Sequence, residues 1–224
     1  MGEQPWVMVT GARGALGAEV VRAFAEAGYR VVEADRALKE THAGLSVAMD
    51  VRDPKSVRET FEGLDRRRIS LDALVHCAGG FRFAMHEGLS DEDARFLLET
   101  NLLSAFWISR EAFSRMKARK RGAILFIGSR ATQDAPAGMG AYCASKAGLN
   151  ALTQSLAKEG LECGVRVNCV QPSIIDTPAN RQAMGTKDAE KWVKPEALAQ
   201  ICLKLCTEWA DPITGALLPV GGKV

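Results

Sequence analysis

The sequence lacks both a long hydrophobic run and a targeting signal at its start. No stretch approaches the roughly 18 apolar residues of a membrane-spanning helix, and no cationic region, apolar core and small-residue cleavage site open the chain. Met1 and Gly2 begin like a myristoylation signal, but Trp6 stands where that signal has Ser or Thr. We therefore expect a soluble, cytoplasmic protein without a membrane partner.

An excess of one charge is also missing. The chain has 29 Lys and Arg against 27 Asp and Glu, a net charge of +2, and both signs are scattered along it. The basic stretches at 66–68 and 117–121 fall where helices are expected to end, beside the negative end of each helix dipole. We therefore expect no nucleic-acid partner.

Histidine is scarce, with three in the chain, and the six cysteines form no C-x-x-C pair and no metal-ligand spacing with a histidine. Cys202 and Cys206 share a helix face at i and i+4, which packing explains better than a ligand pair. Reduced, mostly buried thiols and no metal site are expected.

Apolar runs alternate with helical patterns along the chain. Strands are expected at 6–9, 29–34, 46–50, 72–76, 123–127, 165–170 and 216–220, and helices from 15 and at 54–67, 91–117, 139–161 and 195–208. Continuously apolar strands separated by helices predict a parallel sheet covered on both faces. With 224 residues, 47% of them apolar, the chain can bury this sheet as one α/β domain spanning 1–224.

A glycine-rich turn at 10–17 joins the first strand to the first helix. Glycine permits a close backbone approach to a pyrophosphate, and the helix start offers unpaired N–H groups and a positive dipole end. Asp35 closes the second strand, where an acid can hold a ribose 2′-hydroxyl. Together these features predict a dinucleotide site.

Four polar residues fall where a ligand of such a sheet binds, beyond the carboxyl ends of the strands. Ser129 follows the strand at 123–127, Tyr142 and Lys146 lie at i and i+4 on the next helix, and Asn101 interrupts an apolar helix. A nearby ammonium and an oxidised nicotinamide both favour the phenolate of Tyr142 and lower its pKa. Ser129 could hold the substrate oxygen, and Asn101 could fix a water that carries protons to Lys146. The pattern predicts proton transfer coupled to hydride transfer on a small-molecule substrate.

These motifs resemble those of the short-chain dehydrogenases/reductases over essentially the whole chain. Residues 10–17 are similar to the T-G-x-x-x-G-x-G turn, 78–79 to the end of N-N-A-G, 172–177 to P-G-x-x-x-T, and 214–215 with 221–222 to the carboxyl-terminal pattern. Ser129 precedes Tyr142 by thirteen residues, which is the family's spacing. The resemblance implies a Rossmann-like, doubly wound parallel sheet of about seven strands, catalysis by Ser129, Tyr142, Lys146 and Asn101, and a homo-oligomer, dimer or tetramer, built on the two long helices.

The resemblance also implies an NAD(P) cofactor. Asp35 favours NAD(H), because its carboxylate repels a 2′-phosphate, while Arg13 and Arg36 beside it leave NADP(H) open. Asp50 resembles an adenine-contacting acid or caps the next helix, although Asp53 is the better cap. The residues expected at the cofactor are Gly11, Arg13, Gly14, Ala15, Leu16, Gly17, Asp35, Arg36, Asp50, Val51, Cys77, Ala78, Gly79, Tyr142, Lys146, Pro172, Ile175 and Thr177.

Departures from the family pattern bear on the substrate. Ala15 replaces a glycine, His76 and Cys77 replace two asparagines, and Ser173 replaces a glycine. Several motifs, such as 176–181, are similar to the dihydropteridine reductases, whose members typically lack the serine and helix asparagine present here. We therefore expect a carbonyl or alcohol substrate, or a quinonoid pterin.

Apolar residues around the expected site suit a ring or an acyl chain, but each could equally serve lid packing or subunit contacts. They are Phe81, Phe83, Met139, Met184 and Trp192. The alternative function is a non-catalytic NAD(P)-binding redox sensor, which would usually have lost Tyr142 or Lys146.

Overall fold

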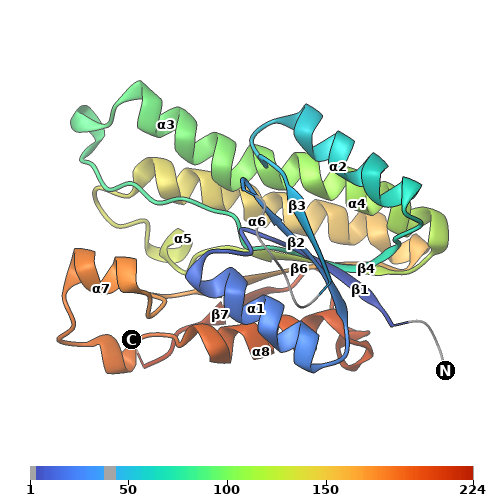
Figure 1. Ribbon diagram of the computed structural model, residues 1–224. Coiled ribbons are helices and arrows are strands. Elements are labelled where there is room, and N and C mark those ends of the chain that lie inside the picture. Colours follow the sequence, from blue (N-terminus) through green and yellow to red (C-terminus); the bar gives the residue numbers. More distant parts are fainter. Residues whose placement is uncertain (1–3, 38–43, 224) are drawn as a thin grey trace.

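Seven strands form one parallel sheet in the computed structural model, which describes residues 4–37 and 44–223 (Figure 1). The strands are β1 (Trp6–Thr10), β2 (Arg30–Asp35), β3 (Gly44–Ala48), β4 (Leu71–His76), β5 (Gly122–Ile127), β6 (Val165–Pro172) and β7 (Leu217–Val220). Their order is β3-β2-β1-β4-β5-β6-β7, so the chain reverses direction across the sheet between β1 and β4. The predicted doubly wound sheet of seven strands is confirmed.

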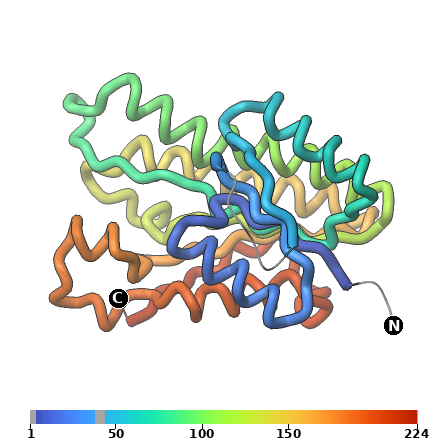
Figure 2. The backbone as a smooth tube through the Cα atoms, viewed as in Figure 1, coloured from blue at the N-terminus to red at the C-terminus, as the bar shows by residue number. Residues whose placement is uncertain are grey.

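Helices cover both faces of the sheet (Figure 1). On one face lie α1 (Ala15–Glu26) and α8 (Pro195–Cys206); on the other lie α2 (Pro54–Arg66), α3 (Asp91–Leu98), α4 (Ser104–Arg119) and α6 (Gly140–Gly160). Two short helices, α5 (Ala131–Asp134) and α7 (Pro178–Met184), follow β5 and β6. The segments at 80–90 and 178–192 project at the same end of the molecule, on the left in Figure 2.

The central strands β1, β4, β5 and β6 are mostly apolar because both of their faces are buried. Met8 of β1 and Ile108 of α4 belong to the core beneath α2, α4 and α6. The next strand residue, Val9, points the other way and packs with Phe24 of α1 and Leu198 of α8. This double burial explains why the sequence shows continuous apolar runs rather than alternation.

The helix predicted at 91–117 is interrupted. Ser90 caps its start by accepting a hydrogen bond from the Asp93 N–H at 3.1 Å. A π-helical turn, η2 (Glu99–Leu103), then separates α3 from α4. Because a π turn adds a residue to the helix without ending it, the apolar periodicity did not reveal it.

The other boundaries agree with the predictions to within a few residues. The strand predicted at 46–50 is β3, which begins at Gly44 and pairs in parallel with β2. The polar segment after β6 contains α7, which Thr177 caps and Gly185 ends. In the described part of the chain, no helix combines the length and the apolar character that crossing a membrane requires.

Candidate active site

The four predicted catalytic residues converge at the carboxyl end of β5. Ser129 follows this strand, and its side chain lies close enough to the Tyr142 phenol to influence the pKa of that group. Lys146, one helical turn further along α6, donates from Nζ to the carbonyl oxygen of Ile127 at 2.7 Å. Asn101 lies opposite, in the π turn, and Gly79 separates it from Lys146. The predicted convergence is thus present in the geometry.

Lys146 is a buried cation without a carboxylate partner among its described contacts. Its side chain is 5% exposed. Burial lowers the pKa of Lys146 to about 8, and the neighbouring thiols of Cys169 and Cys77 offset this only in part. Because desolvation penalises the charged form, this ammonium is close to releasing its proton at neutral pH.

The pKa of Tyr142 differs in direction from the sequence-based expectation. Burial raises it above its ordinary value of 10, while the neighbouring Ser129 side chain lowers it by less. The sequence-based expectation combined the charge of Lys146 with that of an oxidised nicotinamide, and in the chain by itself Lys146 is not among the causes that lower this pKa. The physical reason is that desolvation of the phenol dominates, while Lys146 directs its ammonium to the Ile127 carbonyl.

Asn101 holds the loop after β4. Its Oδ1 accepts from the Gly80 N–H at 2.8 Å, and its Nδ2 donates to the Gly80 carbonyl at 2.9 Å and to Ser145 Oγ at 3.1 Å. Both donors and one lone pair of the amide are therefore used. One lone pair of Oδ1 remains for the expected water. A Cβ on Gly79 would lie 3.3 Å from Asn101 Oδ1 and 3.5 Å from Lys146 Nζ, so glycine keeps the space between them open.

The glycine-rich turn has the shape of a phosphate cradle. Gly11 has φ +59°, and a Cβ there would lie 2.9 Å from the Ala78 backbone nitrogen; a Cβ on Gly17 would lie 2.0 Å from Gly11 O. Neither position tolerates a side chain. Helix α1 begins at Ala15, has no side-chain cap and no acidic residue in its first turn, and so presents free N–H groups and a positive dipole end. These features fit a dinucleotide pyrophosphate.

Asp35 lies beside this turn, at the end of β2. Its Oδ2 accepts from the Arg13 N–H at 3.0 Å, and its Oδ1 accepts from the Arg36 N–H at 2.8 Å. The Arg13 guanidinium lies 3.4 Å from a carboxylate oxygen of Glu33 and donates to Ser46 at 3.3 Å. The carboxylate of Asp35 is thus held by backbone amides, while the charge of Arg13 is shared with Glu33.

The acids after β3 divide their roles. Asp53 caps α2 by accepting from the Lys55 N–H at 2.9 Å, as predicted. Asp50 instead pairs with Arg52 at 3.0 Å, and this hydrogen-bonded pair lowers the pKa of Asp50. Val51 between them is buried. At the end of β4, burial raises the pKa of Cys77 to about 12, which keeps its thiol protonated.

The segment at 172–177 leads into α7. Pro172 ends β6 opposite Val220, and Ile175 bridges to Val193. The Thr177 hydroxyl accepts from the Asn180 N–H at 3.2 Å and so caps α7. Its predicted contact with the cofactor stays a prediction.

An ion cluster that the sequence did not reveal anchors α7. Asp176 Oδ1 lies 2.5 Å from Arg181 Nε, and Asp176 Oδ2 lies 2.5 Å from Lys194 Nζ. The hydrogen bonds from Arg181 and Lys194 hold the pKa of Asp176 well below its usual range. The pattern that could have indicated this cluster is an acid directly before Thr-Pro, with an arginine five residues later.

The expected apolar lining is only partly present. The Phe81 ring lies 5.0 Å from the Tyr142 ring, and Phe83 packs against Gly138. Met184 is 58% exposed on α7, whereas Trp192 is only 5% exposed. Trp192 is therefore a packing residue, which was the alternative reading for each of these side chains.

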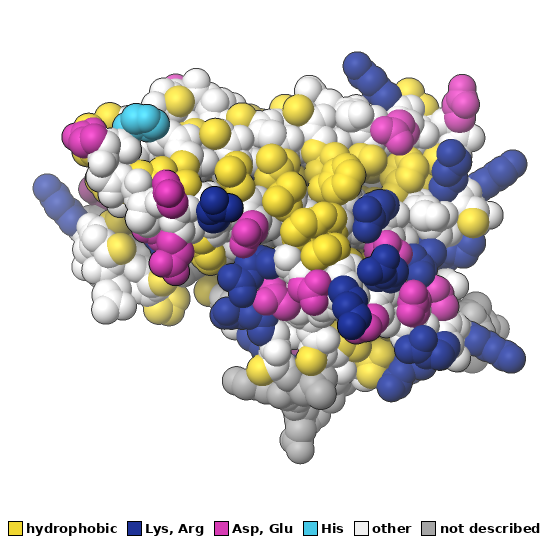
Figure 3. All heavy atoms as spheres, turned by 90° about the horizontal axis from the view of Figure 1, so that it is seen from above, with side chains coloured by type: hydrophobic (Ala, Val, Ile, Leu, Met, Phe, Trp, Pro, Cys, Tyr) yellow, Lys and Arg dark blue, Asp and Glu magenta, His cyan; other side chains and the backbone are white. Residues whose placement is uncertain are grey.

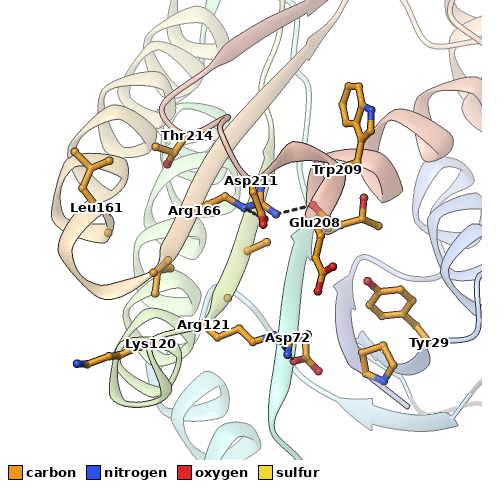
Figure 4. A pocket seen from close by; sticks show the side chains of 18 residues that line it. Tyr29, Asp72, Lys120, Arg121, Leu161, Arg166, Glu208, Trp209, Asp211 and Thr214 are labelled. Carbon is orange, nitrogen blue, oxygen red and sulfur yellow. Dashed lines mark hydrogen bonds and ion pairs between the residues drawn. The ribbon is translucent and has the colours of Figure 1, made fainter. Parts of the chain in front are cut away.

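A large cavity lies at the opposite edge of the sheet. Its volume is about 760 Å³, and it lies at the amino ends of β4, β5 and β6 (Figure 4). Ion pairs border it, Arg121 with Asp72 at 3.5 Å and Arg166 with Asp211 at 3.4 Å. None of the predicted site residues lines this cavity, so it is separate from the candidate site.

Comparisons with known proteins agree with the geometry. Residues 5–188 match the family model described as short chain dehydrogenase. The 2,3-dihydro-2,3-dihydroxybenzoate dehydrogenase of Escherichia coli (strain K12) is 32% identical over 227 residues, which cover 93% of this chain and 92% of that protein. Galactitol 2-dehydrogenase (L-tagatose-forming) of Cereibacter sphaeroides is 32% identical over 238 residues, covering 96% and 92%. The structure of Thermoplasma acidophilum aldohexose dehydrogenase superposes with a TM-score of 0.90 at 25% identity, covering 98% and 93%.

Proposed function

The chain belongs to the short-chain dehydrogenase family and is an NAD(P)-dependent oxidoreductase. From that premise we propose that it interconverts an alcohol and a carbonyl group, with Tyr142 as general acid and base. The observation that carries this proposal is the proximity of the Ser129 side chain to the Tyr142 phenol. It places two hydroxyl groups side by side at the end of β5, where one substrate oxygen can bond to both.

In the reducing direction, the Tyr142 hydroxyl donates its proton to the substrate oxygen as the alcohol forms. In the oxidising direction, the phenolate takes that proton back. Ser129 orients the oxygen, and when bound, the nicotinamide supplies or accepts the hydride. Lys146 uses one of its three N–H groups on Ile127 O and keeps two for the cofactor and for the proton path.

The cofactor that we propose is NAD(H). The turn from Gly11 to Gly17 would hold the pyrophosphate, and Asp35 would accept from a ribose 2′-hydroxyl and repel a 2′-phosphate. Pairing of Arg13 with Glu33 supports this choice, because it diverts one nearby positive charge. The exposed Arg36 keeps NADP(H) as the alternative.

The substrate that we propose is a small alcohol or its carbonyl counterpart rather than a quinonoid pterin. Ser129 and Asn101, which dihydropteridine reductases typically lack, both occupy the site, and Ser129 lies beside the proposed acid. The names of two relatives, 2,3-dihydro-2,3-dihydroxybenzoate dehydrogenase and galactitol 2-dehydrogenase, support the same class.

Replacement of Tyr142 by Phe tests the catalytic role. We expect turnover, followed by nicotinamide absorbance, to fall by about 10²–10⁴-fold, because the acid–base group is lost. NADH affinity should stay close to that of the unaltered chain. Tyr29→Phe is the matched control, because this second tyrosine lines the cavity at the opposite edge of the sheet. Unchanged turnover in Tyr142→Phe would refute the proposal, and a chain that binds NADH without turning over any alcohol or carbonyl would favour the sensor alternative.

We propose further that the chain self-associates through the two long helices predicted at 91–117 and 139–161, the first of which is α3 with α4 and the second α6. The exposed face of α3 and α4 supports this proposal. Hydrophobic side chains gather on this face in Figure 3. Leu98, Leu103 and Phe106 are 42%, 39% and 47% exposed there. Exposed apolar side chains grouped on one helical face are typical of a protein–protein contact.

A further inference from the structure

A chain of buried hydrogen bonds runs behind the candidate site. His76, at the end of β4, bonds through Nδ1 to Thr10 Oγ1 at 2.7 Å and through Nε2 to Ser104 Oγ at 2.9 Å. Ser104 Oγ donates to the Thr100 carbonyl at 2.6 Å, and the Ala78 N–H donates to Thr10 Oγ1 at 3.3 Å. Thr10, His76 and Ser104 are 0%, 2% and 0% exposed.

The direction of every bond in this chain follows from the donors available. Ser104 has one hydroxyl proton and gives it to Thr100 O, so its oxygen must accept from His76 Nε2–H. His76 Nδ1 then accepts from the Thr10 hydroxyl, whose oxygen accepts from Ala78 N–H. Burial and the charge of Lys146 lower the pKa of His76 to about 3, so the ring stays neutral and the order is preserved.

One end of this hydrogen-bond chain adjoins the glycine-rich turn of the proposed dinucleotide site, and the other adjoins the π turn that carries Asn101. Thr10 leads directly into Gly11 of the glycine-rich turn, which packs on the Ala78 backbone. Thr100 precedes Asn101 in the π turn, and Ser104 directly follows that turn.

The connection continues to the catalytic helix. Asn101 donates to Ser145 Oγ at 3.1 Å, and Ser145 Oγ donates to the Tyr142 carbonyl at 2.7 Å. Polar contacts and adjacent backbone thus link the nucleotide turn to the helix that carries the proposed acid.

Packing alone does not account for His76. A buried imidazole is stable only when both nitrogens find partners, and an apolar residue would fill the same space without that requirement. The short-chain dehydrogenase pattern has an asparagine at this position. The longer imidazole of His76 bonds to β1 on one side and to α4 on the other. The two ring nitrogens bond to different elements, one to β1 and the other to α4, so the ring connects these elements.

We propose that His76 is a positioning residue that couples the glycine-rich turn to the π turn, so that dinucleotide binding and the placement of Asn101 depend on each other. This inference rests on the proposed dinucleotide site at Gly11–Gly17. It assigns His76 no contact with substrate or cofactor and no part in proton transfer.

The test removes the Ser104 end of the hydrogen-bond chain and measures nucleotide binding at the glycine-rich turn, which follows its Thr10 end. Ser104→Ala deletes the acceptor of His76 Nε2–H without touching the turn at 10–17. We expect NADH, or NADPH if NADH does not bind, to bind about fivefold or more weakly in a fluorescence titration. Ser109→Ala is the matched control: Ser109 lies on the same helix, is 1% exposed, and donates only within that helix, to Phe106 O at 3.2 Å. Its nucleotide affinity should not change, even if its unfolding midpoint falls as much as that of Ser104→Ala.

A double-mutant cycle identifies His76 as the carrier of the effect. His76→Phe keeps an aromatic ring beside Phe126, where the present ring centroids are 6.3 Å apart, but removes both hydrogen bonds. In that background, Ser104→Ala should weaken nucleotide binding no further. Should His76→Phe fail to fold, the contrast between Ser104→Ala and Ser109→Ala still decides.

Three results are distinguishable. An unaltered chain that binds neither NADH nor NADPH overturns the proposed function and this inference together. An unaltered chain that binds the dinucleotide with the same affinity as Ser104→Ala overturns this inference alone. Additive effects of the two substitutions also overturn it, because they would mean that His76 does not transmit the change at Ser104.

Discussion

The Phe81 ring stands edge-on to the Tyr142 ring, with centroids 5.0 Å apart and planes at 82°. Phe81 is 48% exposed, so its remaining surface borders the space beside the proposed acid. The loop that carries it is held by Asn101 at Gly80, and by Arg82, which pairs with Asp93 at 2.8 Å. Contacts within the protein therefore hold the Phe81 ring beside Tyr142.

Replacing Phe81 by Ala should weaken the use of ring-bearing substrates. Aromatic pairs contribute about 0.5–1.5 kcal/mol beyond the area they bury, which corresponds to a loss in kcat/KM of up to about tenfold. Phe81→Leu keeps apolar volume and should recover part of the loss. Steady-state kinetics with a cyclic and a short acyclic alcohol would measure this. Equal effects on both alcohols would contradict a role in recognising rings.

Replacing Asp176 by Asn should loosen α7. Asp176 carries the negative charge that holds Arg181 of α7 and Lys194 at the start of α8, so its loss leaves two cations facing one another. We expect KM for the substrate to rise several-fold, with a smaller change in kcat and little change in Tm. The matched control is Asp188→Asn, because among the residues that the structure describes Asp188 pairs only with Lys191, at 2.7 Å, in the same segment. Equal KM values for the two variants would show that the cluster does not position α7.

Local patterns predicted much of this fold and site. The first strand, the glycine-rich turn and the acid at Asp35 follow one another within a short stretch, so their order in the sequence is their order in space. Tyr142 and Lys146 share a helix face, so their spacing alone brought them together.

Contacts between distant segments were beyond prediction. Phe81 meets Tyr142, and His76 meets Ser104, only because crossovers between strands bring separate loops to one edge of the sheet. The rise in the pKa of Tyr142 was missed for a related reason: burial is set by the whole surrounding structure, whereas spacing reveals only the neighbour at i+4.

Replacing Phe106 by Glu should prevent self-association. Phe106 is 47% exposed on α4, and burying a carboxylate in an apolar contact is unfavourable. Light scattering after size-exclusion chromatography should show the unaltered chain as a dimer or tetramer and the variant as a smaller species. Trp209→Glu is the control, since this 68% exposed aromatic lines the cavity at the other edge of the sheet. A smaller species with Trp209→Glu but not with Phe106→Glu would contradict this prediction and place the contact between subunits near Trp209.

Replacing Lys146 by Met should abolish turnover yet stabilise the fold at pH 7. Burial lowers the pKa of Lys146 from 10.5 to about 8, and a difference of this size corresponds to a penalty on the order of 3 kcal/mol for keeping the charge inside. Losing the hydrogen bond to Ile127 O costs about 1 kcal/mol in return, so the variant should gain about 2 kcal/mol at pH 7.

The pH dependence of this gain has a definite sign. Between about pH 8 and pH 10.5 the unfolded state binds more protons at Lys146 than the folded state, so the unaltered chain becomes more stable as the pH rises. The advantage of Lys146→Met should therefore shrink steadily from pH 8 to pH 10 in urea unfolding. Lys158→Met, exposed on the same helix, should show neither the stabilisation nor the loss of turnover. A Lys146→Met chain that is less stable at pH 7 would mean that the ammonium is better solvated than its burial implies.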